Sequence, residues 1–219
     1  MPDTPLSREV EIDPGRAALL FIDVQNYSVH RDGGGYAGLG EEEKEEEYGF
    51  FFRTLREVAV PNMRRLQAAC RGGGIEVLYT VIESLTSDGR DRGLDHKISG
   101  IHVPRGSWDA KVFDAIAPAG DEIVLPKTSS SVFISTNLDY VLRNLGVRSL
   151  VVAGVLTDQC VDSAVRDACD LGYLVTTVTD ACATYSRERH DSSLRNARGY
   201  SRQRRTAEVV AEIERLTRG

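Results

Sequence analysis

Five short apolar runs constrain the fold of this 219-residue chain most strongly, because they lack the polar alternation of half-exposed strands. They are rich in β-branched residues and continuously apolar, which is typical of parallel strands that are covered on both faces. The runs span residues 17–22, 75–81, 123–125, 149–155 and 174–178. Residues 199–205 are a candidate sixth strand at an edge of the sheet.

Helical patterns lie between these runs, at residues 61–71, 136–145, 160–171 and 206–217. Pro61 suits a first helical turn, Thr136 is a good N-cap, and Gly146 suits a helix end. Strand and helix therefore alternate, which predicts a three-layer α/β/α fold with a central, mostly parallel sheet. With 41% hydrophobic residues, a chain of this length builds one substantial core, so we expect a single domain over residues 1–219.

Composition excludes several classes of partner. The net charge of −6 argues against nucleic acid and anionic membranes, and no apolar segment approaches the roughly 20 residues that span a bilayer. Residues 1–5 have neither a basic nor an apolar region of an export signal, so we expect a cytoplasmic protein. No pair of cysteines has C-x-x-C spacing, which disfavours a zinc site or disulfide framework; the cysteines are Cys70, Cys160, Cys169 and Cys182.

Polar residues follow the predicted strands where each one ends. Asp23 follows the first strand, Glu83 the second, Lys127 the third, and Cys160 lies just beyond the fourth. The carboxyl ends of parallel strands meet at one edge of a sheet, where ligands bind. A carboxylate after six apolar residues is costly to bury without a partner or a task. An ion pair between Asp23 and Lys127 would explain both residues without catalysis.

Cys160 adds a nucleophile to this edge. It is predicted at the start of a helix, whose partial positive charge stabilises a thiolate. Asp23 would accept the thiol proton, and Lys127 would orient that carboxylate and favour the thiolate. Backbone N–H groups of Leu156 and Cys160 would hold the oxyanion that forms when sulfur attacks a carbonyl carbon. The three residues together predict a unit that cleaves amides.

Other residues are candidates for binding a substrate, each with a structural alternative. The amides of Gln25 and Asn26 could instead satisfy a turn, and Glu83 could pair with Arg90 or Arg92. The candidate substrate contacts are Gln25, Asn26, Glu83, Phe133 and Thr157. Of the four histidines, we expect His30 and His96 to lie nearest the pocket.

Three further stretches have structural and functional interpretations. Residues 28–47 include an acidic run that we interpret as a solvated helix or mobile loop, with a lid over the pocket as the alternative. The polar excursion at residues 84–108 is a candidate for shaping specificity. We interpret the arginines of the C-terminal part as a solvated face or subunit contact; they are Arg187, Arg189, Arg195, Arg198, Arg202, Arg204 and Arg205.

Three segments, at residues 21–26, 125–127 and 154–161, closely resemble the signature segments of the isochorismatase-like cysteine hydrolases. The resemblance implies a parallel sheet of six strands and a catalytic triad of Asp23, Lys127 and Cys160. It also implies a cis peptide bond between Val155 and Leu156, and assembly as a homodimer or homotetramer.

Within this family, the chain is most similar to the ureidoacrylate, biuret and N-carbamoyl amidohydrolases. It lacks the Asp-x-His of the metal site in nicotinamidases, so we expect no metal and no cofactor. A cysteine at position 160 favours hydrolysis of a C–N bond in a small amide or carbamoyl compound. A vinyl-ether hydrolase of the isochorismatase type and a non-catalytic member of the fold remain alternatives.

Overall fold

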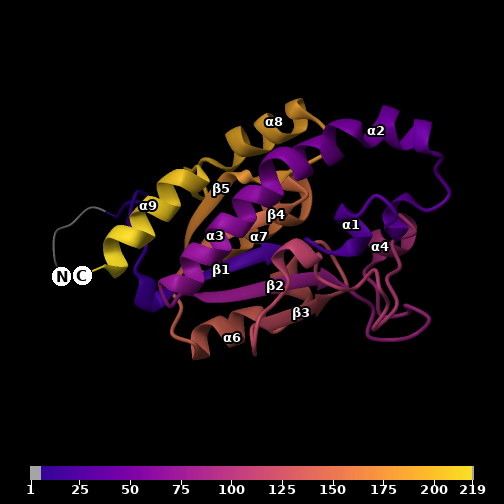
Figure 1. The fold of residues 1–219 in the computed structure, drawn as a ribbon. Coiled ribbons are helices and arrows are strands. Elements are labelled where there is room, and N and C mark those ends of the chain that lie inside the picture. Colours follow the sequence, from indigo (N-terminus) through magenta and orange to yellow (C-terminus); the bar gives the residue numbers. More distant parts are fainter. Residues whose placement is uncertain (1–5, 219) are drawn as a thin grey trace.

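A parallel sheet in the order β3-β2-β1-β4-β5-β6 forms the centre of the structure, a computed structural model that describes residues 6–218 (Figure 1). All strand pairs in this part of the chain are parallel. The predicted α/β fold is therefore confirmed, and the candidate edge strand forms. The strands are β1 (Ala17–Ile22), β2 (Glu76–Ile82), β3 (Ile123–Lys127), β4 (Ser149–Val155), β5 (Leu174–Ala183) and β6 (Arg202–Arg204).

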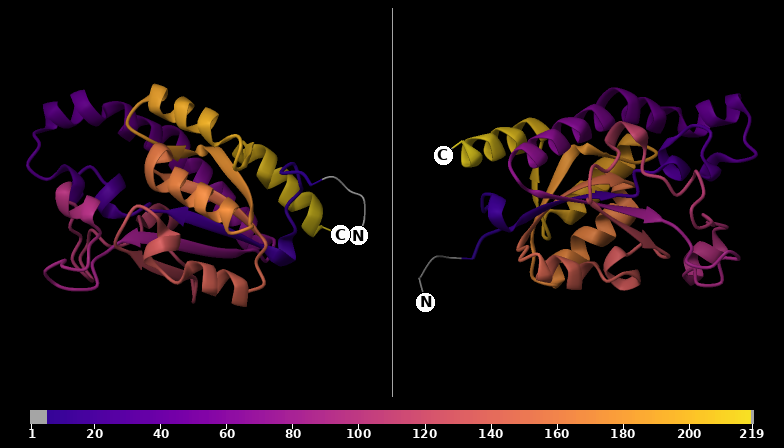
Figure 2. Two further views of the ribbon diagram at one scale, coloured as in Figure 1. Left: turned by 180° about the vertical axis from the view of Figure 1, so that it is seen from behind. Right: turned by 60° about the horizontal axis from the view of Figure 1, so that its bottom comes forward.

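Helices cover both faces of the sheet, as the two side views in Figure 2 show. Alternate residues of β1 point to opposite faces, so Leu19 and Phe21 pack in one core and Leu20 and Ile22 in the other. The first core includes α3 (Val60–Gly72) and α9 (Thr206–Thr217), and the second includes α6 (Leu138–Asn144) and α7 (Asp162–Asp170). Burial on both sides explains why these strands are continuously apolar in sequence.

The helix predicted at residues 61–71 forms as α3 (Val60–Gly72), but helical structure precedes it without a break. Helix α2 (Glu41–Thr54) runs through a π-helical turn (Leu55–Ala59) directly into α3. In that wider turn the N–H of Val60 donates to the carbonyl of Leu55. Proline has no N–H to donate and normally breaks the pairing of a helix. The change of pairing just before Pro61 lets helical structure continue past it, and Pro61 lies in the first turn of α3, as predicted.

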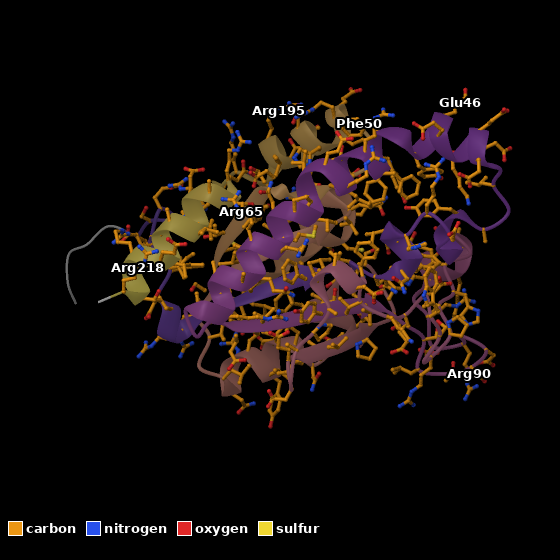
Figure 3. The ribbon with its side chains drawn as sticks, viewed as in Figure 1. Glu46, Phe50, Arg65, Arg90, Arg195 and Arg218 are labelled. Carbon is orange, nitrogen blue, oxygen red and sulfur yellow. The ribbon has the colours of Figure 1, made fainter. Side chains whose placement is uncertain are left out.

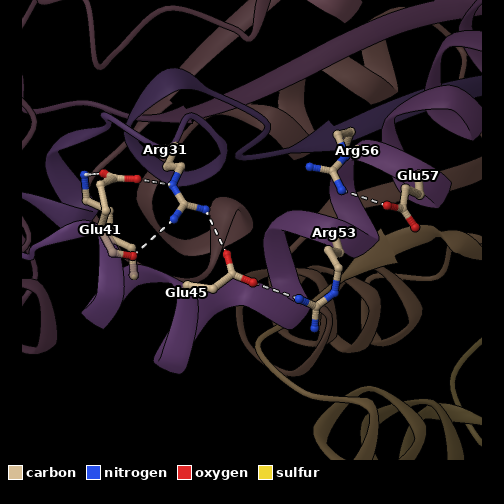
Figure 4. Close-up of polar contacts among 7 residues, drawn as sticks. Arg31, Glu41, Glu45, Arg53, Arg56 and Glu57 are labelled. Atoms are coloured by element: carbon tan, nitrogen blue, oxygen red, sulfur yellow. Dashed lines mark hydrogen bonds and ion pairs between the residues drawn. The ribbon is translucent and has the colours of Figure 1, made fainter.

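The acidic run forms the exposed first half of α2, in agreement with the solvated-helix interpretation. Arg31 pairs with Glu41 at 2.8 Å and with Glu45 at 3.2 Å, and Arg53 pairs with Glu45 at 2.8 Å (Figure 4). These exposed pairs each contribute little to stability. Together they tie the loop before α2 to the helix itself. Figure 3 shows Glu46 and Phe50 on α2, above the segment of residues 84–108 that carries Arg90.

The arginine-rich region contains one arginine that is not solvated. Arg202, in β6, is 2% exposed, and its guanidinium donates to Glu212 at 3.0 and 3.1 Å and to Thr176 at 3.1 Å. These bonds offset the cost of burying its charge. For Arg202 the predicted solvated face was wrong. The region before it forms an unpredicted helix, α8 (Arg187–Ala197), with Ser186 as its N-cap.

No helix within residues 6–218 is long and apolar enough to cross a membrane. The predicted absence of an export signal rests on residues 1–5, which lie outside the described residues.

Candidate active site

The three predicted catalytic residues meet at the carboxyl edge of the sheet. Asp23 follows β1, Lys127 ends β3, and Cys160 lies in the first helical turn after β4. Lys127 Nζ is 2.9 Å from Asp23 Oδ2 and 3.4 Å from Cys160 Sγ, and it donates to the Ser129 carbonyl at 2.8 Å. Asp23 is 2% exposed, Lys127 0% and Cys160 7%. Carboxylate, ammonium and sulfur are thus in direct contact and shielded from bulk water.

Asp23 is held in one orientation by the neighbouring strand. Its backbone has φ of 54°, in the left-handed region that few side chains adopt. The hydroxyl of Thr80, in β2, donates to Asp23 Oδ1 at 2.7 Å. Apart from the ion pair with Lys127, Oδ2 has no hydrogen-bond partner among the described residues. That oxygen is therefore available to accept a proton.

The turn that carries Cys160 depends on a close approach between two strands. Gly154 has φ of +136°, and a Cβ placed there would lie 2.2 Å from the Ile22 carbonyl oxygen. Only glycine fits this position without displacing β1. One residue further on, the peptide bond between Val155 and Leu156 is cis, as the family resemblance implied. A π-helical turn (Thr157–Val161) then leads into α7, so the helix begins three residues before the predicted start at Cys160.

Burial and the neighbouring charges together set the pKa values of Cys160 and Lys127. Burial, followed by the charge of Asp23, raises the pKa of the Cys160 thiol to about 12, against the opposing effect of Lys127. Burial acts to lower the pKa of Lys127, but the charges of Asp23 and Cys160 outweigh it and raise that pKa. Lys127 thus acts in the predicted direction, towards the thiolate, but burial and the charge of Asp23 outweigh it, because a second negative charge would be buried beside the first.

A cavity of about 640 Å³ opens in front of these residues. Cys160, Asp23 and Leu156 lie on its wall. Two histidines were predicted to lie nearest the pocket. His96 lines the cavity, whereas His30 packs edge-on against Trp108. Tyr27, a candidate for the pocket wall from the sequence, also lines the cavity, as do two tyrosines that sequence reasoning missed, Tyr36 and Tyr185.

The candidate substrate contacts are engaged elsewhere. Gln25 is fully buried, and its amide bonds to the backbone N–H and carbonyl of Ile82. Asn26 donates to the Trp108 carbonyl, and Glu83 accepts from the N–H of Gly106. These contacts connect β1 and β2 to the excursion at residues 84–108.

Phe133 and Thr157 have structural contacts of the same kind. Phe133 packs on Tyr173, and the Thr157 hydroxyl is hydrogen-bonded to His190 Nδ1 at 2.9 Å. Within residues 6–218, the cavity lining includes none of the five candidates, Gln25, Asn26, Glu83, Phe133 and Thr157.

Helix α8 holds the turn that carries Cys160, which the sequence did not reveal. Besides the bond from His190 to Thr157, Ser193 donates to the Thr157 carbonyl at 3.0 Å. Arg189 pairs with Asp158 at 2.5 Å. The sequence signal for this contact is that Arg189, His190 and Ser193 share one face of α8. It lies in a stretch that we had interpreted as a solvated face.

No group of three or more His, Cys, Asp and Glu side chains in the described part of the chain could hold a metal ion. The expectation that the reaction needs no metal or cofactor stays a prediction.

Comparison with known proteins gives consistent matches. A family model described as the Isochorismatase domain matches residues 17–212. The ureidoacrylate amidohydrolases RutB of Rhizobium rhizogenes and Agrobacterium fabrum are each 30% identical to this chain over 189 residues. The two matches cover 78% of this chain and 72% and 78% of the two proteins, respectively.

Solved structures agree with the family match. A cysteine hydrolase from Pseudomonas syringae pv. phaseolicola has a TM-score of 0.81 at 25% identity, covering 98% of this chain and 99% of that chain. N-carbamoylsarcosine amidase from Thermoplasma acidophilum has a TM-score of 0.66 at 28% identity, covering 87% of this chain and 96% of that chain.

Proposed function

Because the chain belongs to the isochorismatase family of hydrolases, we propose that it is a cysteine-dependent amidohydrolase. Its substrate would be a small amide or ureido compound, cleaved at a C–N bond. The similarity to ureidoacrylate amidohydrolases and to an N-carbamoylsarcosine amidase supports this reaction class. The observation that carries the proposal is the contact of one buried ammonium, Lys127, with both Asp23 and Cys160.

The first half of the reaction forms a thioester. The Cys160 proton passes to Asp23 Oδ2 as sulfur attacks the substrate carbonyl carbon, and a new S–C bond forms. This transfer removes the charge of Asp23, so the thiolate lies beside Lys127 without a competing carboxylate. The high pKa of the resting thiol therefore describes only the state in which Asp23 is ionised.

Collapse of the tetrahedral intermediate breaks the C–N bond. The N–H groups of Leu156 and Cys160 are our candidates for holding its oxyanion, because first-turn N–H groups have no partner within their helix. Protonated Asp23 returns its proton to the leaving nitrogen. Water then attacks the thioester carbon while Asp23 accepts a proton from it. The S–C bond breaks, the acid leaves, and Asp23 passes that proton to the departing sulfur, which restores the thiol and the ionised carboxylate.

Replacement of Cys160 by alanine tests the proposal. We expect Cys160→Ala to abolish ammonia release across a panel of amides and ureides, while Cys169→Ala, altered at a partly buried cysteine outside the cavity, keeps it. Mass spectrometry of the wild-type protein quenched during turnover should find the acyl group on Cys160. Retained activity in Cys160→Ala would instead support the vinyl-ether hydrolase alternative. A Cys160 that is not acylated, and that is alkylated no faster than Cys70, would support a non-catalytic protein.

The predicted homodimer or homotetramer stays a prediction, which a measurement of the native mass in solution would test.

A further inference from the structure

The charges on the wall of the cavity limit what it can bind, and this inference rests on the proposed function. Among the described residues that line the cavity, Asp23 and Asp95 carry carboxylates, and no lysine or arginine is present. Lys127 lies behind the wall, where its ammonium is already shared among Asp23, Cys160 and the Ser129 carbonyl. A substrate carboxylate would therefore enter without a counter-ion, which is costly away from water.

Three arginines in segments next to the cavity lining are committed to other groups. Arg92 donates to the carbonyls of Gly89 and Ile101, and Arg31 pairs with Glu41 and Glu45. Arg189, below the Cys160 turn, pairs with Asp158. Recruiting any of them to a substrate would first break these contacts.

His96 offers the cavity a neutral polar group. Its side chain is 1% exposed, and its Nδ1 is buried without a hydrogen-bond partner among the residues described. A buried polar atom without a partner is uncommon in a folded protein and calls for one. Burial, followed by the charge of Lys127, lowers the pKa of His96, so the ring is uncharged at neutral pH. A neutral imidazole supplies one donor and one acceptor rather than a positive charge.

Aromatic rings supply much of the remaining surface. Tyr27, Tyr36 and Tyr185 line the cavity together with the aliphatic side chains of Ile82 and Ile101. Flat rings favour flat, weakly polar groups, which can stack on them.

We propose that the substrate is an uncharged, flat amide or ureide with a polar group that hydrogen-bonds to His96, and that carboxylate-bearing analogues are poor substrates. His96 acts as a specificity-determining residue, and Asp95 at the rim disfavours anions. Asp95 is exposed and forms no ion pair within residues 6–218. The class differs from ureidoacrylate, which carries a carboxylate.

A matched pair of substrates tests the proposal. Ureidoacrylate and ureidoacrylamide share one flat skeleton and differ at one end, where an uncharged carboxamide replaces the carboxylate. We expect kcat/KM for cleavage of the ureido group, the group that both compounds share, to be about tenfold higher or more for the amide than for the acid. Equal values, or a preference for the acid, would overturn the proposal. If Cys160 is acylated by neither compound nor by any other amide of the panel, the proposed function fails as well. The acyl-enzyme measurement thus separates the two failures.

Variants of the cavity wall give an independent readout. Ser99 lines the cavity, so Ser99→Arg adds a cation there, and Ser99→Gln is its uncharged control. We expect Ser99→Arg to raise the acid-to-amide ratio of kcat/KM by about tenfold, and Asp95→Asn to raise it less. Ser99→Gln should leave the ratio near its wild-type value.

His96→Ala should raise KM for ureidoacrylamide. Lys97→Gln, at an exposed position outside the lining of the cavity, should not. An unchanged ratio in Ser99→Arg, or an unchanged KM in His96→Ala, would contradict the proposal.

Discussion

Lys127 Nζ lies 2.9 Å from Asp23 Oδ2, and both side chains are almost completely excluded from solvent. Removing one member of such a pair leaves an uncompensated buried charge, which typically costs about 3–5 kcal/mol. The pair therefore supports the fold as well as the proposed chemistry.

Lys127→Met is expected to lower the free energy of unfolding by about 3–5 kcal/mol and to abolish hydrolysis. Combining it with Asp23→Asn should restore part of the stability and none of the activity, because the second change removes the orphaned charge. Urea denaturation measures the first effect and ammonia release the second. Lys111→Met, at an exposed lysine, is the control. A loss in Lys127→Met no larger than in this control would contradict the expectation.

Asp23→Asn should make Cys160 more reactive while stopping turnover. The negative charge of Asp23 helps to raise the pKa of the thiol, and Lys127 lowers it. Neutralising Asp23 therefore increases the thiolate fraction at neutral pH. We expect alkylation of Cys160 by iodoacetamide to be about tenfold faster or more, measured by peptide mass spectrometry. Buried Cys70 provides the reference within the same protein. Slower alkylation in the variant would show that Asp23 does not act on the thiol in this way.

Gly154→Ala should destabilise the protein by about 2–4 kcal/mol. The added Cβ would meet the Ile22 carbonyl at 2.2 Å, and a φ of +136° is strained for alanine. Gly199→Ala is a suitable control, since nothing lies within 4 Å of a Cβ at that position. Thermal and urea unfolding of both variants measure the difference. Equal stability would mean that β1 and β4 separate more easily than their contact implies.

Stability should fall as the pH drops below about 6.5. Burial is the largest cause that lowers the pKa of His96 and of His190. The unfolded chain then takes up protons before the folded protein does, so the contribution is complete above that pH and is lost below it. Urea denaturation from about pH 7.5 to about pH 5.5 checks this. His96→Gln and His190→Gln should each flatten the dependence, and His30→Gln, whose side chain is 38% exposed, should not. A pH profile unchanged by both substitutions would contradict the prediction.

The sequence predicted the sheet well because its strands are buried on both faces. Two strands, β1 and β4, have the predicted bounds, and β5 continues five residues beyond its apolar part. That extension follows from pairing between Gly154 and Cys182 past an irregularity in the register, which only the neighbouring strand reveals. Pro61 lies in the first turn of α3, as predicted, but the helical structure before it depends on the hydrogen bonding of the preceding turn, which the sequence does not show.

The candidate site was predictable where one topological rule applies and less so elsewhere. The carboxyl ends of parallel strands bring Asp23, Lys127 and Cys160 together, whatever the loops do. The cavity wall depends on where side chains point in loops, and loop sequences have no regular hydrophobic pattern from which that direction could be predicted. Gln25 and Asn26 follow β1 directly, yet both satisfy backbone groups, while Tyr185 after β5 turns towards the cavity.

The Lys127 ammonium has three close neighbours within the protein. An ammonium has three hydrogens, and here a carboxylate, a sulfur and a peptide oxygen surround it. No hydrogen is left over for an incoming molecule. All three hydrogens are thus used within the protein, so we expect changes in substrate preference to arise from the residues of the surrounding loops and not from Lys127.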